Sequence, residues 1–173
     1  SQAEHDTAAQ SILMTDDKDF ADSVLAAVDG QLSTLPRRDI AEKSWADFGV
    51  IITLPDLQEA ASLIDRLAPE HLELAVENPQ EMATRISNAG AIFMGRYTPE
   101  AIGDYVAGPN HVLPTAHTAR YASGLSVLDF MKRSSLVACD ADSLAAIGPH
   151  AVRLAEHEGL DAHARSVALR LNK

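Results

Sequence analysis

Carboxylate, imidazole and amide side chains occur with spacings that could support metal binding or proton transfer. Gln2 and His5 are three residues apart, so on a helix both side chains lie on one face and could bind a metal ion together. The same pattern fits a solvated polar helix end, because glutamine is a weak metal ligand. Further along, Glu70 and His71 are adjacent where a helical pattern changes to a strand pattern. They could divide the tasks of general base and water activation, or form a capped turn with a surface histidine.

Two later pairs have the same kinds of side chain. Asp104 and His111 lie in a segment rich in glycine and proline, which would hold an acid and an imidazole on a rigid backbone. Glu158 and His163 lie around Gly159 at the end of the last predicted helix, where a positive histidine has a structural explanation in the helix dipole. The pattern alone leaves ligand binding and plain solvent exposure open at these positions.

Common functional motifs are absent from the sequence. It contains no G-x-G-x-x-G or G-x-x-x-x-G-K-[ST] loop, and no C-x-x-C, H-E-x-x-H or G-x-S-x-G motif. The chain therefore has no recognisable phosphate cradle of its own, and any dinucleotide must be held elsewhere. The single cysteine, Cys139, can form no internal disulfide, and we assign it no chemistry.

The elements that must position these side chains follow from the hydrophobic spacing. Short apolar runs at 12–14, 50–52, 71–76 and 91–94 alternate with helical periodicity. This alternation predicts an α/β fold: part of an open, largely parallel, Rossmann-like sheet layered with helices, followed by a small, mainly helical C-terminal tail domain. We expect residues 1–125 to form the α/β part that carries most of the site, and 126–173 to form the tail domain.

Capping residues and prolines delimit the predicted helices. One helix follows Asp16-Asp17 and ends before Pro36, and a second follows it. Further helices are expected from Pro55 to Pro69, from Asn78-Pro79 onward, and from 143 to 158. The segment from Gly95 to Gly124 has too many glycines and prolines for a continuous helix, so we expect an irregular binding segment there.

Composition limits the class of partner. The 173 residues are 46% hydrophobic and 23% charged, as in an ordinary globular protein of about one domain. A formal net charge of -11 disfavours nucleic acid and anionic membrane surfaces. No apolar run approaches the roughly 20 residues of a membrane span, and no charged-then-apolar leader is present. We therefore expect a cytoplasmic protein that binds neither nucleic acid nor membrane.

Several segments together show a family resemblance. In order and spacing they closely resemble the C-terminal portion of histidinol dehydrogenases, and the resemblance extends from Ser1 to Lys173. The segments are Ser1-Gln2-Ala3-Glu4-His5, Leu67-Ala68-Pro69-Glu70-His71-Leu72-Glu73-Leu74, the stretch from Gly103-Asp104-Tyr105 to Gly108-Pro109-Asn110-His111-Val112-Leu113-Pro114-Thr115, Ser126 to Arg133, and Glu158-Gly159-Leu160-Asp161-Ala162-His163.

The resemblance implies a zinc- and NAD-dependent oxidoreductase. Enzymes of this family oxidise L-histidinol through L-histidinal to L-histidine in two hydride transfers, the last step of histidine biosynthesis. When the family's zinc ligands are assigned to the matching motifs of this sequence, one zinc ion would be bound by Gln2, His5, Asp104 and His163. A nitrogen and oxygen donor set of this kind suits zinc. The metal would orient the substrate and would not itself transfer hydride.

The same resemblance implies roles for the remaining residues. His71 would be the general base, and Glu70 would activate the water that attacks the aldehyde. Glu158 would pair with the ammonium group of the substrate, and His111 would lie near the bound substrate. Gln2, His5, His71, Asp104 and His163 would complete the substrate-binding set.

The resemblance also implies partners that the chain would need. The family's N-terminal part supplies the NAD-binding domain and is not in this sequence, so we expect no turnover by the chain alone. Family members are homodimers, in which Glu158 and His163 would cross into the neighbouring subunit's site. Two alternatives stay open: a related zinc and NAD dehydrogenase that acts on another polar alcohol, such as a sulfonated diol, or an inactive zinc-binding or dimerisation module.

Overall fold

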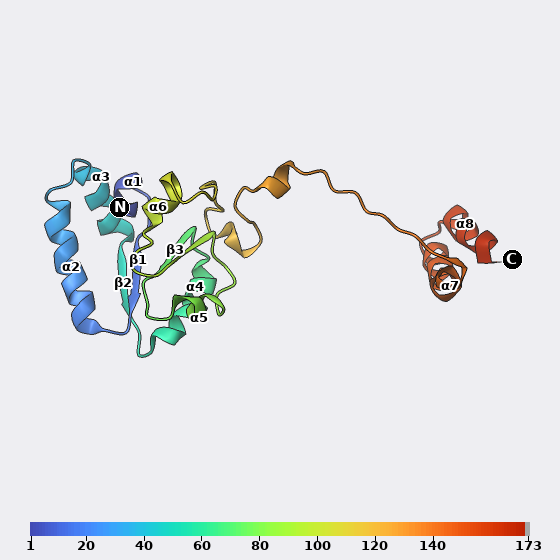
Figure 1. The fold of residues 1–173 in the computed structure, drawn as a ribbon, viewed down its shortest axis with the longest axis horizontal. Coiled ribbons are helices and arrows are strands. Elements are labelled where there is room, and N and C mark those ends of the chain that lie inside the picture. The colour runs from blue at the N-terminus through green and yellow to red at the C-terminus, as the bar shows by residue number, and fades with distance from the viewer. Residues whose placement is uncertain (172–173) are drawn as a thin grey trace. The chain divides into compact units, whose positions relative to one another are not determined.

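The computed structural model describes residues 1–171 and divides the chain into two compact units (Figure 1). The first unit is Ser1–Phe130, and the second begins at Met131. The domains expected from the sequence, 1–125 and 126–173, stay a prediction. No helix within residues 1–171 is long and apolar enough to cross a membrane.

Four short strands, all in the first unit, form two parallel pairs. Strands β1 (Ile12–Thr15) and β2 (Val50–Thr53) pair with Ile12 opposite Val50. Strands β3 (His71–Leu74) and β4 (Ala91–Met94) pair with His71 opposite Ala91. The α/β class with parallel pairing is confirmed, and β3 ends at Leu74, earlier than expected.

The sheet organisation differs from the expected single layer. Among the described residues, β1–β2 and β3–β4 are two separate two-stranded sheets. The apolar runs predict where strands form because each run is local. Which strands pair depends on contacts between distant parts of the chain, and the runs do not encode that. Because a two-stranded sheet is marginal alone, each pair depends on the helices packed against it.

Helices with identifiable start signals surround these strands. Asp17 begins α2 by accepting a hydrogen bond from the backbone N–H of Phe20 (3.0 Å), as expected for the predicted capping pair. Pro55, expected within a helix, precedes it instead: the Asp56 side chain accepts from the N–H of Gln58 (2.8 Å) and starts a 3₁₀ turn that leads into α4. The helices of the first unit are α1 (Gln2–His5), α2 (Lys18–Leu32), α3 (Arg38–Phe48), η1 (Leu57–Glu59), α4 (Ala60–Leu67), α5 (Pro79–Ala83), α6 (Glu100–Tyr105), η2 (Thr118–Arg120) and η3 (Val127–Phe130).

A small apolar core lies between α4, β3 and α5. Ala60, Ala61 and Ile64 of α4 pack with Leu74 and Met82, and partly buried residues of neighbouring elements surround them. This core covers the side of β3 that carries Leu74. Helix α6 packs against β3 as well, within the segment from 95 to 124 that was expected to be irregular.

The second unit is a pair of packed helices, α7 (Ala141–His157) and α8 (Asp161–Leu171). Gly159 reverses the chain between them with a φ of +71°, a backbone conformation that favours glycine. The predicted position of His163 at the end of a helix is wrong, because His163 lies in the first turn of α8. His163 therefore lies near the N-terminal end of α8, where the helix dipole is positive and does not stabilise a charged histidine.

Candidate active site

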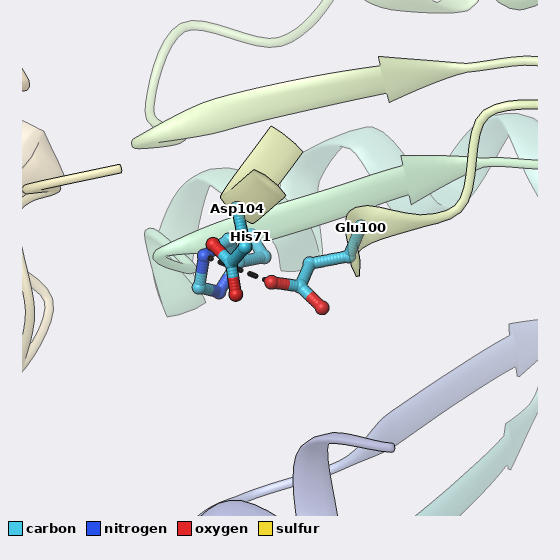
Figure 2. A group of neighbouring side chains, drawn as sticks. All are labelled: His71, Glu100 and Asp104. Atoms are coloured by element: carbon cyan, nitrogen blue, oxygen red, sulfur yellow. Dashed lines mark ion pairs between the residues drawn. The ribbon is translucent and has the colours of Figure 1, made fainter. Parts of the chain in front are cut away.

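Three ionisable side chains of the first unit converge at the start of β3. The side chains of His71, Glu100 and Asp104 offer ligand atoms that all lie within 4.8 Å of one another, the one such group of three within the described part of the chain. The Nε2 atom of His71 lies 3.6 Å from Oε1 of Glu100. Figure 2 shows the three side chains turned toward one another. The side chains of His71 and Glu100 are only 19% and 16% exposed, so water screens their charges incompletely.

The chain before His71 is held by a sharp turn and by β4. Helix α4 ends at Leu67, and its C-cap residue Ala68 is buried and adopts a left-handed conformation with φ of 47°. The backbone then pairs with the chain entering β4: Gly90 N–H donates to the carbonyl of Pro69, and Ala91 N–H donates to that of Glu70, each at 2.9 Å. A Cβ on Gly90 would lie 2.6 Å from the Glu70 carbonyl oxygen, so glycine is required for this approach.

Helix α6 carries the two carboxylates of the group. Glu100 and Asp104 are four residues apart, so they lie on the same face of the helix. Gly103 lets the helix approach β4, because a Cβ there would lie 2.6 Å from the ring of Phe93. The Phe93 ring in turn lies beside His71, with ring centroids 6.1 Å apart. The group is thus backed by an aromatic side chain.

The charge environment of Glu100 is unfavourable for its ionised form. Burial raises the pKa of the Glu100 carboxyl above its ordinary value, and hydrogen bonding to Asp104 and the negative charge of Asp104 raise it further. The charge of His71 acts in the opposite direction, and that of Glu73 adds to the increase. A bound cation or a protonated His71 would relieve this repulsion, so the group is suited to holding positive charge.

The structure brings together some of the residues singled out in the sequence. His71 and Asp104 meet in the group, with Glu70 half-buried directly before His71. Gln2 and His5 share α1, as their spacing predicts, with Gln2 half-buried and His5 exposed. Their helix packs on α3.

Arg37 secures this first helix at its C-terminal end. Its side chain donates to the backbone carbonyls of Glu4 (3.0 Å) and His5 (3.4 Å). These are carbonyls that the end of a helix leaves without intrahelical partners. The contact fixes the backbone at His5, while His5 itself is not part of the three-residue group.

The other predicted residues are not members of this group. His111 is exposed in the chain after α6, next to a turn in which the Asn110 side chain accepts from the N–H of Val112 (2.8 Å). Glu158 and His163 are exposed in the second unit, at the end of α7 and the start of α8. Their roles as ligands or substrate contacts stay predictions.

Sequence reasoning missed Glu100. Its signal was the four-residue spacing to Asp104, which puts two carboxylates on one helix face if the segment is helical. That segment was expected to be irregular, so the spacing went unused. Its proximity to His71 comes from the packing of α6 on β3, which a local pattern does not encode.

Comparison with known proteins identifies the chain. Its parallel strands, covering helices and half-buried histidine–carboxylate group define an α/β protein with a candidate acid–base and metal-binding site. The family profile described as histidinol dehydrogenase matches residues 1–171. The chain therefore belongs to the histidinol dehydrogenase family, and the resemblance noted from its motifs is confirmed.

Individual relatives agree with this assignment. The chain is 65% identical to a histidinol dehydrogenase of Rhodospirillum rubrum, over 100% of this chain and 40% of the relative. It is 59% identical to one from Rhizobium meliloti, over 99% of this chain and 39% of the relative. The crystal structure of histidinol dehydrogenase from Elizabethkingia anophelis matches with a TM-score of 0.87 at 37% identity, over 98% of this chain and 39% of that one. The chain thus spans about two-fifths of the length of these relatives.

Proposed function

We propose that this chain supplies the acid–base and metal-binding part of a histidinol dehydrogenase, which oxidises L-histidinol through L-histidinal to L-histidine with NAD in the cytoplasm. The observation that carries the proposal is the half-buried group of His71, Glu100 and Asp104, in which His71 and Asp104 come from two of the segments on which the family resemblance rests. The activity belongs to a protein of the relatives' full length, since this chain covers about two-fifths of it.

His71 is the proton acceptor in this proposal. In each of the two oxidations the substrate loses a hydride and a proton, and the imidazole takes the proton from the reacting oxygen. Imidazole titrates near neutral pH, which suits a group that must accept and release a proton twice in one cycle. Glu70 activates the water that adds to the aldehyde between the oxidations. The partial burial of both side chains supports these roles, because it limits competition from bulk water.

Zinc binding is proposed at Gln2, His5, Asp104 and His163, with His111 and Glu158 near the substrate. Asp104 is half-buried within the three-residue group, and its carboxylate with the imidazoles of His5 and His163 makes a donor set that zinc accepts, so the proposed residues fit the metal. When bound, zinc would supply a fixed template for the imidazole and amino groups of the substrate. Asp104 is held in place as a residue of α6, which packs on β3, and Glu158 would pair with the ammonium group.

The turns after β1 and β2 do not fit a dinucleotide. Asp17 caps the helix after β1, with Asp16 and Asp19 nearby, and Asp56 caps the turn after β2. These carboxylates occupy the positions where a pyrophosphate would need free N–H donors and no negative charge. When bound, NAD supplies the hydride acceptor, and we place its site in the part of the longer protein outside this sequence.

Variants at the base test the proposal. In the full-length protein, His71→Ala should lower kcat with histidinol and NAD by about 10²- to 10⁴-fold, the usual contribution of a general base. Zinc content should stay near that of the unaltered protein, and Glu70→Gln should behave similarly. His150→Ala, at an exposed histidine on α7, is the matched control and should change neither quantity. Loss of zinc from His71→Ala with a normal zinc-replete rate would make His71 a ligand and contradict the assignment.

A mixing experiment tests the proposed homodimer. If His163 and Glu158 reach the site of a neighbouring subunit, His71→Ala and His163→Ala chains each lack a different half of a shared site. Subunit exchange between the two inactive variants should then restore activity, because one site of each mixed dimer is intact. Two His71→Ala preparations mixed together are the control, and absence of recovery after verified exchange would show that each site is built from one chain.

A further inference from the structure

Strand β3 contacts the first residue of α6 at two points. His71 and Glu73 are two residues apart, so their side chains lie on the same face of the strand. The His71 imidazole faces the side-chain carboxylate of Glu100, and the Glu73 carboxylate accepts a hydrogen bond from the backbone N–H of Glu100 at 2.6 Å. One residue of α6 is thus held by its side chain and by its backbone.

From this arrangement we propose that Glu73 and Glu100 form a positioning pair for the reaction: Glu73 fixes α6 on β3, and Glu100 thereby orients the imidazole of His71. The inference rests on the proposed function, in which His71 is the base, and adds two residues to it. Neither of them is expected to touch the substrate, so both are positioning residues.

The need for an external contact follows from the length of α6. A helix of six residues, Glu100–Tyr105, is far below the roughly 12 to 15 residues at which an isolated helix becomes even marginally stable. Its N-cap residue is Pro99, whose side chain makes no capping hydrogen bond. Glu73 supplies the missing acceptor from another element, which also places negative charge at the positive end of the helix dipole.

The second part of the pair acts on the ring. The Glu100 side chain is 16% exposed and faces Nε2 of His71 at 3.6 Å, too long for a strong hydrogen bond but close enough for a charge contact in a poorly hydrated site. The Phe93 ring limits the imidazole from another side. A carboxylate in this position restricts the orientations that the imidazole ring can adopt, as in other histidine bases oriented by a carboxylate.

Kinetics of full-length variants test the pair. Glu73→Ala should lower kcat by about 10- to 100-fold, the range known for residues that orient the reacting groups through a partner, while KM for histidinol changes much less. Glu73→Gln should restore most of kcat, because its amide oxygen accepts the same N–H. Glu100→Gln should lower kcat by a similar factor without loss of zinc. Glu81→Gln, at an exposed glutamate in the first turn of another short helix, is the matched control.

A structural readout keeps the inference testable apart from activity. Crystal structures of Glu73→Ala and Glu100→Gln should show the His71 ring rotated or in two orientations, and the Glu81→Gln structure should not. If Glu73→Ala lowers thermal stability but keeps kcat and the ring orientation, Glu73 is merely structural and the inference is wrong. Equal losses for Glu73→Gln and Glu73→Ala would exclude the hydrogen bond as the cause.

Failure of the proposed function gives a different pattern. If the unaltered full-length protein forms no NADH from histidinol, the proposed function fails, whereas the ring orientations in the crystal structures still decide whether the pair positions His71. Should Glu73→Ala not fold, Glu100→Gln, which keeps the shape of the side chain, decides the same question.

Discussion

The group around His71 in the first unit and the candidate residues of the second unit are held in opposite ways. In the first unit, His71 and Asp104 are half-buried, and Glu73, Gly103 and Phe93 fix the elements that carry them. In the second unit, Glu158 and His163 are exposed, and the side chain of His163 makes no hydrogen bond within the described residues. The first set is organised by the chain itself. The second set needs another surface before it can act, which agrees with the homodimer proposed above.

Large apolar side chains are exposed in both units, and the units differ in how many apolar residues they bury. The first unit has an apolar core of α4, β3 and α5. In the second unit, α7 and α8 bury only Gly148 and Ala164, while Ile147, Leu154 and Leu169 are exposed by more than half. A helix pair with so much apolar surface in water is typical of a segment completed by a partner. The difference teaches that candidate functional residues of one chain can be ordered in two ways, by the chain's own packing or, under the proposed homodimer, by a partner surface.

Removal of single proposed zinc ligands should have the largest effect on this comparison. Asp104→Ala and His163→Ala should each lower zinc affinity by more than the roughly 10- to 100-fold that follows loss of a ligand's hydrogen-bond partner. Without metal, however, His163→Ala should change stability by no more than about 0.5 kcal/mol, as expected for an exposed residue. Metal analysis and thermal unfolding of the metal-free full-length proteins measure both effects, and unchanged zinc content in either variant would remove that residue from the proposed site.

A methyl group at Gly103 should show how tightly the first unit is packed. Gly103→Ala places a carbon 2.6 Å from the Phe93 ring and should cost about 1–3 kcal/mol of unfolding free energy, the usual range for overpacking. Gly30→Ala is the control, because Gly30 lies inside α2 with no atom near its Cβ position. It should stabilise the protein by about 0.5–1 kcal/mol in the same denaturation experiment. Stabilisation by both changes would mean that α6 is not in close contact with β4.

The charge of Glu100 should make stability depend on pH. Its pKa is raised in the folded protein, so the protonated form favours folding: this contribution is present in full below the ordinary pKa of glutamate and is lost as pH rises through the raised value. Glu100→Gln should therefore increase the Tm of the metal-free protein at neutral pH, with the difference shrinking as the pH falls below about 4. Glu81→Gln should show no such trend, and a constant Tm difference for Glu100→Gln would contradict the effect of burial.

The smallest effect is expected at the corresponding glycine of the second unit. A Cβ on Gly148 would lie 3.0 Å from Cδ2 of Leu171, the end of a flexible side chain that can move aside. Alanine also has the higher helix propensity. Gly148→Ala should therefore change the unfolding free energy by less than about 0.5 kcal/mol, as judged by denaturant titration. A loss as large as that of Gly103→Ala would show that the helix pair is packed as tightly as the first unit.

Local signals in the sequence predicted much of the fold. The apolar runs located all four described strands, and Asp17 begins α2 as its position in the sequence suggests. Both signals depend on neighbouring residues alone. Strand pairing was not predictable in this way, because the separation into β1–β2 and β3–β4 depends on contacts between elements far apart in the chain.

The candidate site was predictable at the residues that belong to a family motif. His71 and Asp104 were singled out by type and by family resemblance, and the structure brings them together. Glu100 and Glu73 were missed, since their roles arise only when α6 packs on β3. His163 was expected at the C-terminal end of a helix because the sequence analysis did not recognise that a new helix, α8, begins at Asp161 after the chain reverses at Gly159.

The alternation of β3 has a consequence for how this sequence can change in evolution. His71 and Glu73 lie on one face of the strand, and Leu72 and Leu74, which pack in or against the apolar core, lie on the other. Exchange of one side chain alters one contact. Insertion or deletion of a single residue between Pro69 and His71 would instead exchange the two faces, turning leucines toward α6 and the ionisable groups toward the core. This stretch should therefore accept substitutions but keep its length.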